Sequence, residues 1–155
     1  MDWKDVDTTY CGIAATTAAV GDRWSQLILR EVFFGVRRYR DIQHHLDISP
    51  SILADRLQKL TENGILSKVR YHTNGNRHRY EYQLTERGLG LAFVQLALAE
   101  FGYEHLLNED QRLVSLHDRA TGQRVRLGLI REDGTPVERD AVEARIDESL
   151  GQTAT

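Results

Sequence analysis

Hydrophobic positions between residues 37 and 84 change their spacing at Gly64, and this change divides the segment into two kinds of structure. Before Gly64, apolar residues recur every three or four positions, as they do on one face of a helix. After Gly64 they alternate with polar residues, as in a strand with one buried face. The pattern predicts a short helix, a turn, a longer helix, and then two strands joined by a polar, basic loop.

The longer predicted helix has clear start and stop signals. Ser49 is expected to cap its N-terminus, and Pro50 occupies the first helical position, where a missing N–H costs nothing. Gly64 suits the left-handed position that ends many helices. Two faces are predicted: a buried one with Leu53, Leu57 and Leu60, and an outer one with Ser51, Asp55, Gln58, Lys59 and Glu62.

The two predicted strands form a hairpin. Residues 65–71 and 78–84 flank the sequence Thr73-Asn74-Gly75-Asn76, and an Asn-Gly pair between alternating segments is a strong hairpin signal. A helix-turn-helix followed by such a β-wing places one helix in the major groove of DNA. The segment is therefore predicted to be a DNA-reading element.

Further helices are expected on both sides of this element, over residues 11–20, 24–34 and 85–106. The last segment is apolar on more than one face, which is more surface than one small domain needs to bury. We therefore predict that it forms a dimer interface together with the small-residue segment 11–20. The alternative is an internal core helix.

The C-terminal third has a different pattern. Residues 114–116 and 123–129 alternate as half-buried strands, which predicts a β-hairpin or a three-stranded appendage, and residues 140–150 suggest a short charged helix. The predicted fold class is mainly α with a small β component. The expected divisions are a flexible N-terminus (1–10), the winged domain with its dimerisation helices (11–107), the β-rich appendage (108–150) and a disordered tail (151–155).

Charge is distributed unevenly along the 155 residues. The net charge of −3 and the pI near 6.1 argue weakly against nucleic-acid binding. Residues 37–84, however, hold nine Lys/Arg and five Asp/Glu. Binding to phosphate depends on this local field more than on the total. No apolar run is long enough to span a membrane, and the acidic N-terminus is unlike a secretory signal, so we expect a cytoplasmic protein without a membrane partner.

Ordered motifs extend over about residues 11–107. They are Cys11, Gly21-Asp-Arg-Trp24-Ser, Ile28-Leu-Arg-Glu with Gly35, Arg38-Tyr39-Arg40-Asp41-Ile42, Ile48-Ser49-Pro50, Leu53-x-x-Arg56-Leu57-x-x-Leu60, Gly64-Ile65-Leu66, Tyr71, Glu81-Tyr82-x-Leu84-Thr85-x-x-Gly88 and Phe101-Gly102-x-x-His105. Together they resemble the HxlR-type family of winged helix-turn-helix transcriptional regulators. The resemblance implies a bacterial homodimer that binds double-stranded DNA and has no enzymatic activity. The chain departs from the family pattern at Tyr39, usually Phe, and at Arg77-His78, usually two prolines.

Candidate DNA-contacting residues lie in three groups. They are Ser49, Ser51, Ile52, Asp55, Arg56 and Lys59 on the recognition helix; Asn74, Gly75, Asn76, Arg77 and Arg79 on the wing; and Arg38 and Arg40 for the DNA backbone. Other interpretations remain open. Asp55 could pair with Lys59, Arg56 could brace the core, and Arg38 or Arg40 could pair with Asp41 or Glu31.

Control of the regulator has two candidate sites. Several members of the family use a cysteine at the position of Cys11 as a thiol sensor, so the resemblance implies redox or electrophile sensing there. The alternative is a small buried residue at the dimer seam. A small-molecule effector could instead occupy a pocket lined by aromatic residues such as Trp24, Phe93 and Phe101.

Metal and catalytic sites are not predicted. The adjacent His44 and His45 would point about 100° apart on a helix, so they do not form a ready ligand pair, and His72 and His78 add no ligand set. No nucleophile–base arrangement is present and no cofactor is expected. The sequence predicts a DNA-binding regulator, expected to be a repressor acting on a pseudo-palindromic operator. The alternative is a protein-interaction adaptor built on the same domain.

Overall fold

The computed structural model describes Lys4, residues 8–73 and residues 75–146. It divides into two compact units, one ending at Gln95 and one beginning at Leu96. We call residues 8–95 the N-terminal unit and residues 96–146 the C-terminal unit. The domain boundary predicted near residue 107 stays a prediction. No helix in the described ranges is long and apolar enough to cross a membrane.

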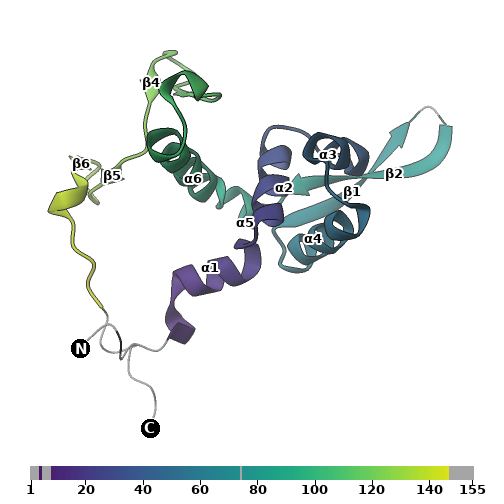
Figure 1. The fold of residues 1–155 in the computed structure, drawn as a ribbon, viewed down its shortest axis with the longest axis horizontal. Coiled ribbons are helices and arrows are strands. Elements are labelled where there is room, and N and C mark those ends of the chain that lie inside the picture. Colours follow the sequence, from purple (N-terminus) through teal and green to yellow (C-terminus); the bar gives the residue numbers. More distant parts are fainter. Residues whose placement is uncertain (1–3, 5–7, 74, 147–155) are drawn as a thin grey trace, which may run out of the picture. The chain divides into compact units, whose positions relative to one another are not determined.

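The N-terminal unit is a helical cluster with one long β-hairpin (Figure 1). After a 3₁₀ turn at Thr8–Tyr10, its elements are α1 (Gly12–Val20), α2 (Arg23–Phe33), α3 (Tyr39–Leu46), α4 (Pro50–Glu62), β1 (Leu66–Thr73), β2 (Gly75–Leu84) and α5 (Glu86–Leu89). Helix α6 (Ala92–His105) begins in this unit and continues into the next. The expected helix-turn-helix and wing are therefore confirmed, as is the mainly α fold class.

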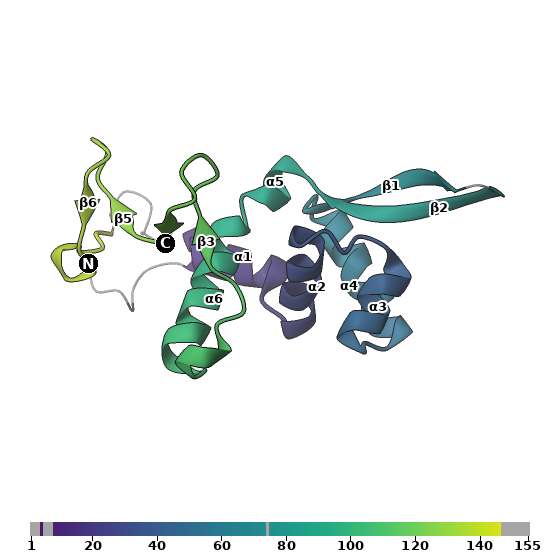
Figure 2. The same cartoon turned by 90° about the horizontal axis from the view of Figure 1, so that it is seen from above.

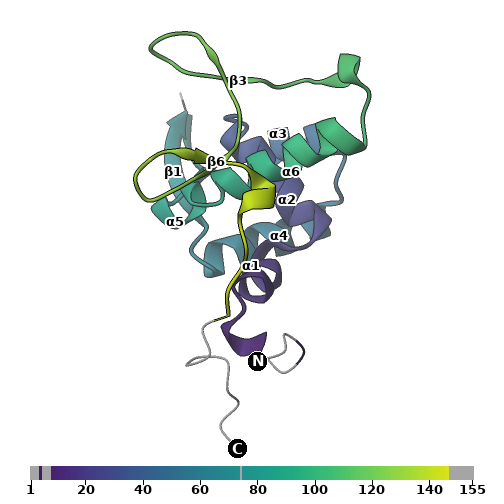
Figure 3. The ribbon, with the colours of Figure 1, turned by 90° about the vertical axis from the view of Figure 1, so that its left-hand side faces the viewer.

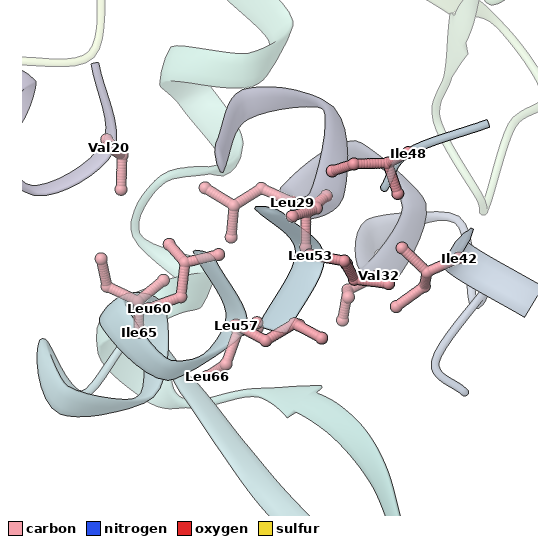
Figure 4. Close-up of a cluster of buried hydrophobic side chains, with 11 residues drawn as sticks. Val20, Leu29, Val32, Ile42, Ile48, Leu53, Leu57, Leu60, Ile65 and Leu66 are labelled. Carbon is pink, nitrogen blue, oxygen red and sulfur yellow. The ribbon is translucent and has the colours of Figure 1, made fainter. Parts of the chain in front are cut away.

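The core of this unit lies between α2, α3, α4 and the start of β1 (Figure 4). The predicted stripe on α4 is its centre, because Leu53, Leu57 and Leu60 are each at most 1% exposed. Burying an aliphatic side chain of this size contributes about 1.5–3 kcal/mol. The other buried apolar residues are Val20, Ile28, Leu29, Val32, Ile42, Ile48, Ile65 and Leu66.

The turn between α3 and α4 is short because of its capping residues. Asp47 ends α3 in the left-handed conformation, with φ at 48°. Two residues later, the Ser49 hydroxyl accepts a hydrogen bond from the Ile52 N–H at 3.4 Å, as the predicted N-cap of α4. Pro50 occupies the first helical turn, as expected. The short connection fixes the angle between the two helices.

The hairpin is longer than the sequence pattern predicts and projects beyond α3 and α4 (Figures 1 and 2). Its antiparallel register runs from the Leu66–Leu84 pair to the Tyr71–Arg79 pair and is irregular beyond that point. A third segment joins the base of the sheet. The Tyr82 N–H donates to the Arg37 carbonyl at 2.8 Å, and Arg38 forms a β-bridge with Glu81. These bonds tie the wing to the start of α3.

The prediction of one continuous helix over residues 85–106 is wrong. The structure instead has the short α5 and then α6, separated at Gly90-Leu91. Thr85 starts α5 by accepting from the Gly88 N–H at 3.0 Å and donating to the Gly64 carbonyl at 2.6 Å. This capping places Gly88 against the backbone of Ile65, the residue before β1, and two glycines within three positions weaken helix propagation.

The C-terminal unit contains two separate hairpins, visible at the labels β3 and β6 in Figure 3, and not one three-stranded sheet. The pairs are β3 (Leu116–His117) with β4 (Arg124–Val125), and β5 (Leu129–Ile130) with β6 (Pro136–Val137). Each turn has a glycine at positive φ, Gly122 at 70° and Gly134 at 85°. Residues 126–128, predicted inside a strand, instead connect the two hairpins.

The charged helix expected over residues 140–150 is not formed in its described part. A 3₁₀ turn spans Arg139–Ala141, and Val142 then adopts an extended conformation. Its branched side chain favours extended backbone, which opposes helix propagation at that point. Residues 147–155, including the predicted tail, lie outside the described residues, as does most of the predicted flexible segment 1–10.

Gly88 provides a test of the packing of α5 against Ile65, the residue before β1. A Cβ atom at this position would lie 2.2 Å from the Ile65 carbonyl oxygen, a backbone atom that cannot move without disturbing β1. We expect Gly88→Ala to lower the free energy of unfolding by about 1–3 kcal/mol in a denaturant titration. Gly12→Ala is the matched control, because a Cβ there meets no atom within 4 Å. Equal stability of both variants would contradict the close approach.

Candidate nucleic-acid interface

The outer face of α4 is exposed along its first two turns. Ser49, Ser51 and Asp55 are exposed, and Ile52 is 38% exposed although it is apolar. The Ser49 and Ser51 hydroxyl oxygens lie 3.4 Å apart. Polar and small apolar groups at the start of a recognition helix are those that meet base edges in the major groove. The structure thus turns outward the face that the sequence predicted.

Tyr39 helps to fix the start of α4. Its hydroxyl donates a hydrogen bond to the Pro50 carbonyl at 2.9 Å. The ring also packs against the core. Phenylalanine, the residue usual at this position in the family that the sequence resembles, has no hydroxyl for this bond. The substitution therefore adds a polar link between α3 and the first turn of α4.

Arg56 has two acidic neighbours, in agreement with the bracing role that was one of its two interpretations. Its Nε lies 2.9 Å from Oδ1 of Asp22, and its Nη1 donates to Oδ2 of Asp55 at 2.6 Å. The guanidinium is also only partly exposed. Asp55 pairs with Arg56 and not with Lys59, the partner considered from the i+4 spacing. Arg56 therefore holds α4 against the start of α2.

Asp22 joins that contact to the N-terminus of α2. Its carboxylate accepts from the Ser25 N–H at 3.0 Å and from the Ser25 hydroxyl at 2.6 Å. Burial raises the pKa of Asp22, but the Ser25 hydrogen bonds and the charges of Arg56 and Lys59 outweigh it, so the pKa lies below its ordinary value. One carboxylate thus caps α2 and anchors α4.

The wing carries more cations than the sequence analysis selected. Arg79 is exposed, as predicted. In addition, the Lys68 ammonium lies 4.5 Å and the Arg70 guanidinium 5.9 Å from the centre of the Tyr80 ring. Hydrogen bonding by Arg70 lowers the pKa of Tyr80. Lys68 and Arg70 were missed, although their two-residue spacing places them on one face of β1.

The wing tip is described only in part, whereas Arg38 and Arg40, the candidates for the DNA backbone, are fully described. Asn74 lies outside the described residues, and so do the side chains of Asn76 and Arg77; Gly75 begins β2. Arg38 lies over the Tyr71 ring at 4.9 Å, and Arg40 is exposed. Both arginines are therefore near the junction of α3 and the wing.

Glu31 is buried, and its partners differ from those considered above. Its Oε1 accepts from Arg30 at 2.6 Å, and its Oε2 lies 2.5 Å from Nδ1 of His45. Burial raises the pKa of Glu31, but hydrogen bonds from His45 and Arg30 outweigh it and lower the pKa overall. His45 thus links α3 to α2. In the portion of the chain that the structure covers, no group of three potential metal ligands occurs.

The residues of the two candidate control sites have different surroundings. Cys11 is the N-cap of α1, partly exposed, and its Sγ accepts from the Ala14 N–H at 3.4 Å. Trp24 packs against the core with the Arg23 guanidinium 4.7 Å from its ring. Phe93 and Phe101 on α6 are 73% and 55% exposed. The sensor and the aromatic pocket both stay predictions.

Comparison with known proteins decides the family. The family model described as HxlR-like helix-turn-helix matches residues 19–110, more than half of the chain. The chain belongs to the HxlR-like family. An HTH-type transcriptional regulator of Mycobacterium tuberculosis, Rv3095, is 38% identical over 104 residues, which are 67% of this chain. The match spans 65% of that relative, so this chain covers less than two thirds of its length.

Solved structures agree with the HxlR-like assignment. PA1607, described as a candidate transcription factor, is similar to this chain with a TM-score of 0.75 and 32% sequence identity. The match covers 89% of this chain and 96% of the PA1607 chain. The transcriptional regulator YodB from B. subtilis, in its reduced form, has a TM-score of 0.52 at 26% identity, covering 62% of this chain and 93% of its own. The names of these relatives describe them as transcription regulators or transcription factors.

The shared carboxylate gives a pH-dependent test. Asp22→Asn keeps a side chain that can cap α2 but removes the charge that faces Arg56. Because the native pKa of Asp22 is lowered, its ionised form stabilises the fold above about pH 4, and this contribution is lost as the pH falls through the lowered value. We expect the variant to be about 1 kcal/mol less stable at pH 7.

The measurement is denaturant unfolding of both proteins between pH 7 and about pH 3. The difference in free energy should shrink as the pH falls below about 4. A difference that stays constant over this range would mean that the Asn change acts through the cap and not through the ion pair.

Proposed function

We propose that the protein is a sequence-specific DNA-binding transcriptional regulator that represses by occupying a pseudo-palindromic operator as a homodimer. The observation that supports it best is the outward, polar first half of α4 beside a projecting hairpin with exposed cations. Membership of the HxlR-like family agrees with this function. In such an arrangement, α4 enters the major groove and the hairpin follows the adjacent backbone or minor groove.

Base reading is assigned to the first turns of α4. Ser49 and Ser51 can donate to or accept from base edges, and Ile52 suits a thymine methyl group. Asp55 can accept from a cytosine amino group through the oxygen that Arg56 leaves free. Arg56 itself acts as a positioning residue, because its pairing with Asp22 sets the position of α4.

Phosphate binding is assigned to cations around α4. Lys59 is on α4, Arg79 on the wing, and Arg38 and Arg40 at the start of α3. Lys68 and Arg70 extend this set along β1. Contacts to phosphate position the protein and make binding depend on salt, whereas base contacts provide sequence preference.

A homodimer would cover the apolar surface of α6. None of the residues of this helix is buried within the described chain. Phe93, Leu98 and Phe101 are each more than half exposed, and so is Ile13 on α1. Exposed apolar patches of this kind mark interfaces. Two copies related by a twofold axis would present their α4 helices to half-sites about 34–36 Å apart.

Control by thiol modification is proposed for Cys11. Its side chain is partly exposed and lies at the start of α1, one of the proposed dimer helices. The structural neighbour YodB has been described in a reduced form, so its redox state distinguishes forms of that regulator. With one cysteine per chain, oxidation can form an intersubunit disulfide or an adduct with an external thiol.

The DNA-binding surface is tested with single-charge variants. In a mobility-shift titration on a palindrome taken from the intergenic DNA beside the coding region, Lys59→Ala and Arg79→Ala should each weaken binding. The slope of log affinity against log salt should fall by about 1 for each lost phosphate contact. Arg119→Ala is the matched control, because it removes the same charge from the exposed β3–β4 turn.

Light scattering and thermal unfolding show whether the variants keep the assembly and the fold. Parental affinity in both variants would mean that the reading surface is misplaced. Binding without preference for the palindrome over unrelated DNA would instead favour the adaptor function.

The thiol proposal is tested with Cys11→Ser. This change keeps the shape and a hydrogen-bond acceptor at the N-cap of α1 but removes the oxidisable sulfur. We expect normal operator binding without oxidant and no loss of binding when diamide or a quinone is added. If the variant still responds as the parent does, Cys11 is not the sensor.

A further inference from the structure

The C-terminal unit contains a charged cavity that the proposed DNA contacts do not use. It lies between the second half of α6 and the β3–β4 hairpin and has a volume of about 510 Å³. An adjoining hollow of about 540 Å³ shares Glu104, Arg112 and Arg124 and adds Tyr103. Cavities of this size hold small molecules.

One ion pair in the wall is already complete. Arg112 donates to both carboxylate oxygens of Glu100, at 2.8 and 3.1 Å, and its guanidinium lies 4.6 Å from the Tyr103 ring centre. The Tyr103 hydroxyl in turn accepts from the Val114 N–H at 3.1 Å. Two-point pairing of this kind restricts both side chains. This part of the wall is therefore ordered and has no net charge.

Three other charged groups of the wall are left without such a partner. The side chains of Arg124 and Arg126 form no hydrogen bond or ion pair within residues 8–73 and 75–146, although the Arg124 charge is near enough to Glu100 to help lower the pKa of that carboxyl. The Glu104 carboxylate lies 3.7 Å from His105, and both of those side chains are more than half exposed. Its charge also acts on Arg112 and helps to raise the pKa of that guanidinium, but Arg112 donates its hydrogen bonds to Glu100. Two guanidinium groups and one carboxylate are thus available to a ligand.

The combination of charges restricts what can bind. A simple carboxylate or phosphate would meet the negative Glu104, and a simple amine would meet the positive Arg124 and Arg126. A molecule that has both charges satisfies all three groups. Leu116 and Val125 add apolar surface to the same cavity. Polar groups that fix orientation beside an apolar patch are typical of small-molecule sites.

We propose that this cavity binds a zwitterionic small molecule of the α-amino acid class. Arg124 and Arg126 hold the carboxylate, Glu104 holds the ammonium group, and the ligand side chain lies against Leu116 and Val125. Binding itself does not depend on the DNA-binding proposal. Its regulatory meaning rests on that function, because Glu104 belongs to α6, the helix proposed to form the dimer.

The test is isothermal titration calorimetry of the 155-residue protein with each standard α-amino acid, with acetate and ethylamine as single-charge probes. At least one amino acid should bind with a Kd between about 1 µM and 1 mM, and both probes at least about tenfold more weakly. Arg124→Gln and Glu104→Gln should each weaken amino-acid binding by about tenfold or more. Arg119→Gln should change nothing, because Arg119 does not line the cavity.

Several results would overturn the proposal. One is that no amino acid binds at concentrations up to about 10 mM. Another is that acetate binds as tightly as the amino acids and that Glu104→Gln does not change amino-acid binding. Arg124→Lys keeps the charge and should bind more tightly than Arg124→Gln, whereas equal loss in both would indicate a disturbed hairpin and no carboxylate contact.

Operator binding by Glu104→Gln and Arg124→Gln without amino acid separates the two proposals. Both variants should bind DNA as the parent does. Failure of the parent to bind an operator while it still binds an amino acid would overturn the regulator and leave the cavity assignment intact.

Discussion

Burial of one face of α4 is the constraint on which the rest of the N-terminal unit depends. Leu53, Leu57 and Leu60 are in the centre of the core, so the helix cannot rotate about its axis without exposing them. The face opposite these leucines must therefore lie in solvent. Side chains that could read DNA are presented as a direct consequence of how the core is packed.

Polar contacts then restrict the movement that apolar packing leaves free. Hydrophobic burial has little directional preference, and it would allow α4 to slide or tilt slightly. Arg56 ties its middle to Asp22, and the Tyr39 hydroxyl ties its first turn to α3. At the other side, the bond from Tyr82 to the Arg37 carbonyl joins the wing to the same helix pair. Direct contacts therefore join α4, α3 and the wing.

Most of the N-terminal unit could be predicted because its signals are local. Ser49 and Pro50 mark the start of α4, and the leucine spacing identifies the face that is buried. The break between α5 and α6 could not be predicted in this way. It depends on Gly88 approaching Ile65, a residue distant in the sequence, and no helix propensity contains that contact.

The candidate site shows the same division. The exposed positions on α4 follow from periodicity, whereas the partner of Arg56 is a carboxylate 34 positions earlier in the chain, at Asp22. Sequence spacing suggested that Arg56 could brace the core but could not name the residue with which it would pair. Lys68 and Arg70 were overlooked because the pattern drew attention to the turn, although the strand leading to it carries the charges. In the C-terminal unit, short segments with weak alternation left the pairing of strands undecided.

The projecting hairpin also has a consequence for solubility. Two long strands with open edges are a template on which other chains can add strands and aggregate. Along the base of β2, residues 37 and 38 already occupy that edge. On β1, Lys68 and Arg70 place like charges along the strand, which repel a second hairpin of the same kind. The cations proposed to meet phosphate thus also oppose edge-to-edge pairing between hairpins of separate molecules.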